Sequence, residues 1–306
     1  MSDSYGKVLI TGATGYIGSQ LVTKLLKDGN DVHIVCRKIN PVYALAKREP
    51  SIVIHEHDGS TENLIEIVKL ANPEIIYHLA SLFIVSHEPK DLRSLIDSNI
   101  LFTTQLLEAM AINNVKKLIN TGTSWQTYTE SIRVPVNLYA STKKAGQSIV
   151  DYYAQANNLH VISLILYDTY GPRDNRGKLV STLIKSAHTD TLLDMSAGEQ
   201  TIDLVYIDDI LSAFVHAPSL FNDEEWEHNK YSVATGIPMS IKEIVSVVER
   251  ITKLNIPIRW GVKKYRQREI MIPFYEYPLL PKWETIITLE EGLKTLYEYF
   301  KDVKKP

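Results

Sequence analysis

Three glycines spaced three residues apart, Gly12, Gly15 and Gly18, join a short apolar run at residues 8–11 to the first stretch of helical periodicity. The apolar stripe that follows consists of Ile17, Leu21, Val22, Leu25 and Leu26. In a strand-turn-helix unit, such glycines allow a tight turn, close approach of the backbone to a diphosphate, and close packing of the helix on the strand. The free amide hydrogens of the helix then favour the diphosphate. The chain is therefore predicted to begin with a dinucleotide-binding unit.

Short β-branched runs alternate with longer helical stretches through the first half of the chain. We expect strands at residues 8–11, 32–36, 52–56, 75–79, 117–121 and 161–166. The alternation predicts an α/β fold in which helices wrap a doubly wound parallel sheet. Two of the expected helices, at about 91–113 and 139–157, are apolar enough to pack between two copies of the chain, although covering their own sheet is the simpler explanation. A homodimer is expected.

The alternation ends after Gly171 and Pro172, and a smaller irregular lobe is predicted from there. Runs at 204–207 and 231–234 are two further predicted strands. The predicted domains are a nucleotide-binding domain at residues 1–169, to which 204–235 returns, and a C-terminal substrate lobe made of 170–203 and 236–306.

Composition narrows the classes of function. The 306 residues carry a formal charge of -3, with 44% hydrophobic and 23% charged residues, which suits a globular protein and gives no electrostatic case for nucleic acid or an anionic membrane. A single cysteine, Cys36, excludes an internal disulfide and fits a reducing compartment. The N-terminus lacks the pattern of a signal peptide, and no apolar run approaches the ~20 residues that span a bilayer. We therefore expect a cytoplasmic protein.

The end of the second predicted strand indicates which dinucleotide binds. An NAD site commonly has a carboxylate there for the ribose 2'-hydroxyl, whereas this chain has Arg37 and Lys38. Two positive charges at this position favour binding of NADP, which carries a 2'-phosphate, over binding of NAD. The alternative is that they form only a solvated basic loop. At the end of the third strand, Asp58 and Gly59 are predicted to contact the adenine, and a turn-forming role for Asp58 is the alternative.

Tyr139 and Lys143 lie four residues apart and share one face of a predicted helix. A lysine charge near a buried phenol is expected to lower the phenol pKa from about 10, so that the tyrosine exchanges protons near neutral pH. Any amphipathic helix can hold such a pair. Here the glycine turn and the hydroxyl-rich strand end at Thr121, Thr123 and Ser124 favour the catalytic interpretation.

With the glycine turn, Asn99, Tyr139 with Lys143, and Asp208 with Asp209 in this order, the chain resembles the extended short-chain dehydrogenase/reductases over nearly its whole length. The resemblance implies a Rossmann sheet, a smaller C-terminal substrate-binding lobe and a nucleotide-linked sugar as substrate. The stretches 122–126, 135–139 and 167–172 look most like those of nucleotide-linked 4-keto-deoxyhexose 4-reductases, such as the CDP-abequose and CDP-paratose synthases.

The resemblance also implies roles for single residues. Tyr139 would be the acid/base, Lys143 its electrostatic partner and a ribose ligand, and Thr123 the hydroxyl that holds the reacting sugar oxygen, with Ser124 as the alternative. Together with the strand ends described above, the expected cofactor contacts are Gly12, Thr14, Gly15, Tyr16, Ile17, Gly18, Arg37, Lys38, Asp58, Gly59, Leu79, Ala80, Ser81, Thr121, Tyr139, Lys143, Tyr167 and Thr169. The expected substrate contacts are Thr123, Ser124, Asp168, Arg173, Arg176 and Arg266. Ile202 stands where an arginine often meets the nucleotide diphosphate.

These roles predict NADPH-dependent reduction of the 4-keto group of a nucleotide-linked 6-deoxy or 3,6-dideoxy hexose, with Tyr139 as proton donor. An NAD-dependent nucleotide-sugar 4-epimerase, which keeps its cofactor bound, is the alternative. A non-catalytic NADP-binding regulator of the same fold is a third possibility, disfavoured because Tyr139 and Lys143 are both present. No metal is expected, since His55 and His57 beside Asp58 make a poor metal site.

Overall fold

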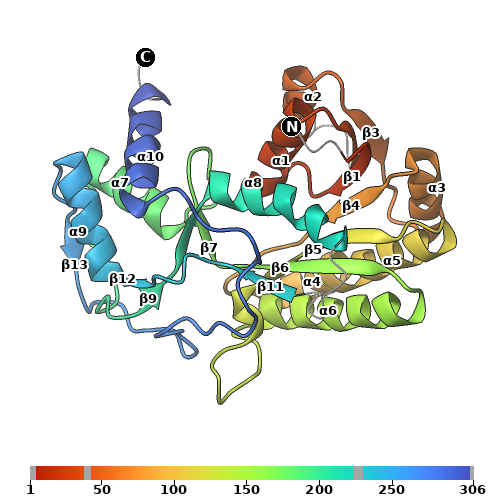
Figure 1. Ribbon diagram of the computed structural model, residues 1–306. Coiled ribbons are helices and arrows are strands. Elements are labelled where there is room, and N and C mark those ends of the chain that lie inside the picture. The colour runs from red at the N-terminus through yellow and green to blue at the C-terminus, as the bar shows by residue number, and fades with distance from the viewer. Residues whose placement is uncertain (1–4, 38–42, 223–229, 304–306) are drawn as a thin grey trace.

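The computed structural model describes residues 5–37, 43–222 and 230–303, and a seven-stranded parallel sheet forms its centre (Figure 1). The strands are β1 (Lys7–Thr11), β2 (Asp31–Cys36), β3 (Val53–Glu56), β4 (Ile75–His78), β5 (Lys117–Thr123), β6 (His160–Leu166) and β11 (Lys230–Val233). They lie in the order β11-β6-β5-β4-β1-β2-β3, which is the doubly wound Rossmann arrangement. The predicted α/β fold is confirmed, and each predicted strand of this sheet agrees with the structure to within two residues at either end.

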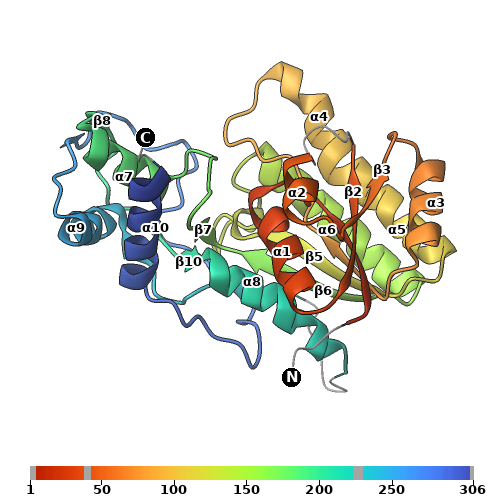
Figure 2. The same ribbon diagram turned by 90° about the horizontal axis from the view of Figure 1, so that it is seen from above.

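Helices cover both faces of the sheet (Figures 1 and 2). The first face carries α1 (Tyr16–Lys27) and α8 (Ile207–His216), with α2 (Tyr43–Arg48) beside α1. The second face carries α3 (Thr61–Ala71), α5 (Phe102–Ile112) and α6 (Leu138–Ala156). Along β1, Val8 and Ile10 belong to the first core and Leu9 to the second. This period of two explains why the strands are continuously apolar, since both of their faces are buried.

The helical stretch predicted at 91–113 is present but is not one regular α-helix. A 3₁₀ turn (Pro89–Asp91) leads into α4 (Leu92–Ile96), and a π-helical turn (Asp97–Leu101) leads into α5. The π turn carries the buried Asn99, whose amide nitrogen donates to the carbonyl of Leu82 at 3.0 Å and to the hydroxyl of Thr142 at 2.9 Å. Asn99 thereby ties the loop after β4 to α6, the two segments that border the candidate site described below.

A smaller lobe lies beside the sheet, at the left of Figure 1. Its helices are α7 (Leu179–Thr189), α9 (Ile241–Thr252) and α10 (Leu289–Val303). Its short strands are β8 (Leu193–Asp194), paired with β13 (Ile258–Arg259), and β9 (Thr201–Ile202), paired with β12 (Met239–Ser240). Between the two bodies, β7 (Asp168–Tyr170) pairs with β10 (Leu204–Tyr206), so the strand predicted at 204–207 forms outside the main sheet, whereas β11 joins that sheet. The exact domain boundaries stay a prediction.

The buried Asp203 fastens this junction. Its carboxylate accepts hydrogen bonds from the backbone and the hydroxyl of Thr235, from the Gly236 backbone and from the Tyr275 hydroxyl, at 2.7–2.9 Å.

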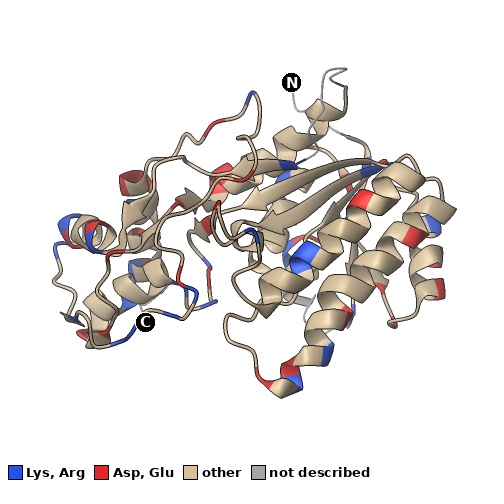
Figure 3. Cartoon of the chain, turned by 90° about the horizontal axis from the view of Figure 1, so that it is seen from below, with Lys and Arg blue, Asp and Glu red and all other residues tan. Residues whose placement is uncertain are grey.

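Two further 3₁₀ turns are Ser124–Gln126 and Ala217–Asn222. In the view of Figure 3, acidic and basic residues are interspersed along the helices and loops. None of the helices in the described ranges is long and apolar enough to cross a bilayer.

Candidate active site

The glycine turn lies at the carboxyl end of β1 and is packed too closely for a side chain at Gly12 or Gly18. A Cβ atom on Gly12, whose φ is +75°, would lie 2.6 Å from the backbone nitrogen of Ala80. A Cβ atom on Gly18 would collide with the carbonyl oxygen of Gly12. The turn therefore brings the start of α1 against the end of β1, and no side chain at Gly15 caps the helix with a hydrogen bond. This cradle fits a dinucleotide diphosphate.

One cavity extends from the glycine turn to the end of β2. The predicted cofactor residues that line it are Gly12, Thr14, Gly15, Arg37, Leu79, Ala80 and Ser81. Arg37 is exposed at its rim, and Lys38 lies outside the described residues. Asp58 forms a turn, because its carboxylate accepts hydrogen bonds from the backbone and the hydroxyl of Ser60, both at 2.7 Å. These bonds lower the pKa of Asp58, and its contact with adenine stays a prediction.

A second cavity, called here the reaction cavity, brings the glycine turn together with the proposed catalytic groups. The predicted residues that line it are Gly12, Gly15, Tyr16, Ile17, Gly18, Leu79, Ser81, Thr121, Thr123, Tyr139, Tyr167, Thr169 and Arg176. Residues more than 100 positions apart in the sequence thus face one space. They meet because the carboxyl ends of parallel strands share one edge of the sheet.

Tyr139 is 8% exposed, and burial raises its pKa to about 12. Hydrogen bonding with Thr123, the charge of Arg176 and hydrogen bonding with Ser81 lower this pKa, but by less than burial raises it. The predicted lowering of this pKa is therefore wrong for this structure, because loss of water around the phenol outweighs the nearby cation and donors. Tyr139 remains protonated at neutral pH. A protonated phenol suits a group that donates a proton.

Lys143, one turn further along α6, is also 8% exposed, and burial lowers its pKa to about 8. It borders a small polar space behind the reaction cavity, together with Asn99, Asn120, Thr121 and Gln147. The ammonium is mostly charged at pH 7 and loses its proton as the pH rises through about 8.

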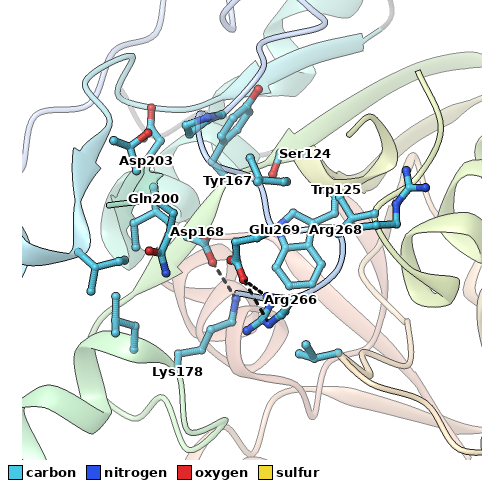
Figure 4. Close-up of a pocket in the computed structure, with 18 of the residues that line it drawn as sticks. Ser124, Trp125, Tyr167, Asp168, Lys178, Gln200, Asp203, Arg266, Arg268 and Glu269 are labelled. Carbon is cyan, nitrogen blue, oxygen red and sulfur yellow. Dashed lines mark hydrogen bonds and ion pairs between the residues drawn. The ribbon is translucent and has the colours of Figure 1, made fainter. Parts of the chain in front are cut away.

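A third cavity, called here the substrate cavity, lies between the sheet and the smaller lobe (Figure 4). Of the predicted substrate residues, Ser124, Asp168, Arg176 and Arg266 line it. The Asp168 carboxylate forms an ion pair with the Lys178 ammonium, with 3.1 Å between Oδ1 and Nζ. The Nε atom of Arg266 lies 3.9 Å from Oε2 of Glu269. Arg173 is exposed and does not belong to the described lining of either cavity.

The two candidates for holding the reacting oxygen are separated by the structure. Strand β5 extends to Thr123, two residues beyond the prediction, and Thr123 faces the reaction cavity in hydrogen-bonding contact with Tyr139. Ser124 faces the substrate cavity. The side-chain oxygen of Gln126 accepts a hydrogen bond from the Thr123 backbone at 2.7 Å and fixes this turn. The geometry therefore favours Thr123.

Four residues line both the reaction cavity and the substrate cavity, and we call them the neck: Phe83, Tyr167, Arg176 and Lys178. The ring of Phe83 meets Tyr139 edge-on at 4.9 Å, and the Lys178 ammonium lies 5.1 Å from the Phe83 ring centroid. The neck thus lies where the substrate cavity adjoins the cavity that Tyr139 lines. Sequence reasoning missed Phe83, because a single loop aromatic carries no periodic signal.

His55 and His57 do not come together as metal ligands. His55 pairs with His33 at 2.8 Å between ring nitrogens, and His57 pairs with Asn63 at 3.1 Å. Within the described ranges, no group of three or more metal-binding side chains occurs.

Known proteins are similar to this chain in sequence and in fold. The model of the NAD dependent epimerase/dehydratase family matches residues 8–233. A CDP-abequose synthase from Yersinia pseudotuberculosis is 31% identical over 273 residues, which is 89% of this chain and 93% of that protein. Another CDP-abequose synthase, from Salmonella muenchen, is 26% identical over 97% of this chain and 98% of its own length. The structure of a UDP-glucuronic acid 4-epimerase from Bacillus cereus in complex with UDP-glucuronic acid and NAD is 25% identical, with a TM-score of 0.82, and covers 97% of this chain and 99% of that one.

Proposed function

The chain belongs to the NAD dependent epimerase/dehydratase family and is a nucleotide-sugar modifying enzyme, and we propose that it reduces the 4-keto group of a nucleotide-linked 6-deoxy or 3,6-dideoxy hexose with NADPH. The observation that carries this proposal is the neck, which opens the substrate cavity onto Tyr139, Thr123 and the glycine turn. A nucleotide-linked sugar can place one ring carbon at the neck, close to Tyr139, while its nucleotide stays in the substrate cavity.

The chain's own groups divide the work of reduction. The glycine turn would hold the dinucleotide, whose dihydronicotinamide would supply the hydride for the carbonyl carbon. Thr123 donates a hydrogen bond to the carbonyl oxygen, where negative charge develops. Tyr139, protonated because its pKa is about 12, delivers its phenolic proton to that oxygen. Lys143 stabilises the phenolate that remains, and the product is a secondary alcohol.

The walls around the neck support a deoxygenated sugar. The substrate cavity has an apolar group in its lining, beside polar residues such as Lys178 and Arg266, and the ring of Phe83 in this group also contacts Tyr139. The group consists of Phe83, Val85, Trp125 and Val136. Apolar side chains suit a methyl group at C6 and a ring carbon without a hydroxyl, whereas they would leave additional hydroxyl groups without partners. Two relatives named CDP-abequose synthase favour the same substrate class.

Consumption of cofactor tests the proposed reaction directly. The protein, incubated with NADPH and 4-keto-6-deoxy sugars linked to CDP, TDP, GDP or UDP, is expected to oxidise one NADPH per sugar with at least one of them. Absorbance follows the cofactor, and NMR gives the configuration of the new alcohol. Interconversion of sugars without consumption of NADPH would instead identify an epimerase.

A nucleotide-sugar 4-epimerase is the second candidate, because the B. cereus enzyme of that name shares the fold and its structure holds NAD. An epimerase uses the same proton donor and keeps its cofactor, so the two candidates differ in cofactor exchange rather than in catalytic groups. A non-catalytic regulator has no comparable support, since Thr123, Tyr139 and Lys143 are all present in one region.

The exposed Arg37 at the cofactor cavity favours NADPH over NADH. A guanidinium binds a 2'-phosphate through charge-assisted hydrogen bonds, so Arg37→Ser is expected to weaken NADPH binding about tenfold and to leave NADH binding nearly unchanged. Fluorescence titration of both cofactors against the parent and the variant measures this difference. Tighter binding of NADH than of NADPH by the parent protein would contradict the NADP assignment.

A homodimer and a cytoplasmic location stay predictions.

A further inference from the structure

Arg176 is anchored from the side of the smaller lobe. Its Nε and Nη2 atoms donate to the two carboxylate oxygens of Asp174, each at 2.7 Å, and the Asp174 side chain is only 1% exposed. A paired contact of this kind fixes the plane of the guanidinium as well as its position. The Nη2 atom also lies 3.4 Å from the carbonyl oxygen of Thr169, at the centre of β7.

The same guanidinium reaches the glycine turn. Its carbon lies 4.5 Å from the ring centroid of Tyr16, the residue that begins α1 between Gly15 and Gly18. The Tyr16 hydroxyl packs closely against Gly171 in the segment after β7: a Cβ atom added to Gly171 would lie 2.9 Å from the hydroxyl oxygen. That hydroxyl is buried and has no hydrogen-bond partner among the described residues. The Tyr16 ring, rather than its hydroxyl, therefore carries the contact with Arg176.

Charge complementarity indicates what this arrangement binds. Arg176 lines the reaction cavity together with Gly12, Gly15 and Gly18, and its Nη1 atom takes no part in the contacts with Asp174 and Thr169. The diphosphate of a dinucleotide cradled by this turn carries negative charge at the first turn of α1. A fixed guanidinium with donors remaining, placed across the same cavity, suits that charge.

We propose that Arg176 is a cofactor-binding residue that clasps the dinucleotide from the side of the smaller lobe and sets the rate at which it leaves. This rests on the proposed function only in requiring that a pyridine nucleotide occupies the glycine turn. The sequence had grouped Arg176 with the substrate residues, and its contact with Tyr16 assigns it to the cofactor instead. A reductase must release its cofactor in every turnover, so the clasp has a direct effect on the catalytic cycle.

Displacement of bound NADPH by excess NADP, followed by stopped-flow fluorescence without any sugar, tests the clasp. Loss of charge-assisted hydrogen bonds in Arg176→Gln is expected to raise the dissociation rate constant about tenfold. Lys185→Gln, which removes an exposed positive charge from the nearby helix α7, is the matched control and should release cofactor at the parent rate. A rate for Arg176→Gln within about twofold of the parent would overturn the proposal.

A second pair of variants keeps the test informative if Arg176→Gln does not fold. Tyr16→Leu removes the ring under the guanidinium and should also speed release, whereas Tyr152→Leu, at an exposed tyrosine of α6, should release cofactor at the parent rate. Equal release by these two variants would overturn the clasp. Weaker binding of CDP or UDP by Arg176→Gln, with unchanged cofactor release, would return Arg176 to the substrate. Since no sugar is present, these outcomes do not depend on which 4-keto sugar is reduced.

Discussion

Tyr139→Phe is expected to lower turnover by about 100- to 10,000-fold, the usual contribution of a positioned general acid, while cofactor affinity changes little. The protonated phenol of Tyr139 shares the reaction cavity with the glycine turn, and it lies in hydrogen-bonding contact with Thr123. Phenylalanine preserves the ring packed against Phe83 and removes only the hydroxyl group whose proton must reach the substrate oxygen. Initial rates with the accepted sugar and fluorescence titration of NADPH separate these two effects.

A second tyrosine on the same helix provides the control. Tyr152 is 64% exposed, so Tyr152→Phe should match the parent in both rate and affinity. If Tyr139→Phe instead kept more than about a tenth of the parent rate, Tyr139 would not be the proton donor, since such a loss is below the range expected for a general acid.

Gly18→Ala is expected to weaken cofactor binding about 100-fold or more, because small displacements of a preorganised site have effects of this size. The added Cβ atom would collide with the carbonyl oxygen of Gly12 and would lie 3.1 Å from the Cα atom of Ala13, so α1 must move away from β1. That movement carries the amide groups at the start of α1 out of the diphosphate cradle. Titration of NADPH fluorescence measures the loss.

The other end of α1 supplies a matched glycine. Gly29 has a φ of +85° and no atom within 4 Å of its Cβ direction, so Gly29→Ala strains the helix end without touching the site. It should lower the free energy of unfolding by about 1 kcal/mol and leave cofactor affinity unchanged. Equal affinity of the Gly18→Ala and Gly29→Ala variants for NADPH would show that close packing at Gly18 is not needed for binding.

Local sequence patterns were sufficient for the fold. The apolar runs at 8–11 and 75–79 predicted buried parallel strands because β-branched residues bounded by turns suit a sheet covered on both faces. The glycine spacing predicted the cradle, since a turn between strand and helix depends on neighbouring residues only. The spacing of Tyr139 and Lys143 likewise predicted that they share one face of α6, although it did not indicate the π turn that ties this helix to the loop after β4.

The sequence by itself determined the succession of strands and helices along the chain, the glycine turn, and the placement of Tyr139 and Lys143 four residues apart on one helix, because each depends on a pattern within a short segment. Only the tertiary structure decided that burial outweighs the charge of Arg176 and raises the Tyr139 pKa to about 12, that Thr123 rather than Ser124 lines the cavity with Tyr139, and that Arg176 reaches Tyr16. Desolvation and the lining of a cavity depend on segments that are distant in the chain, and no local pattern carries that information.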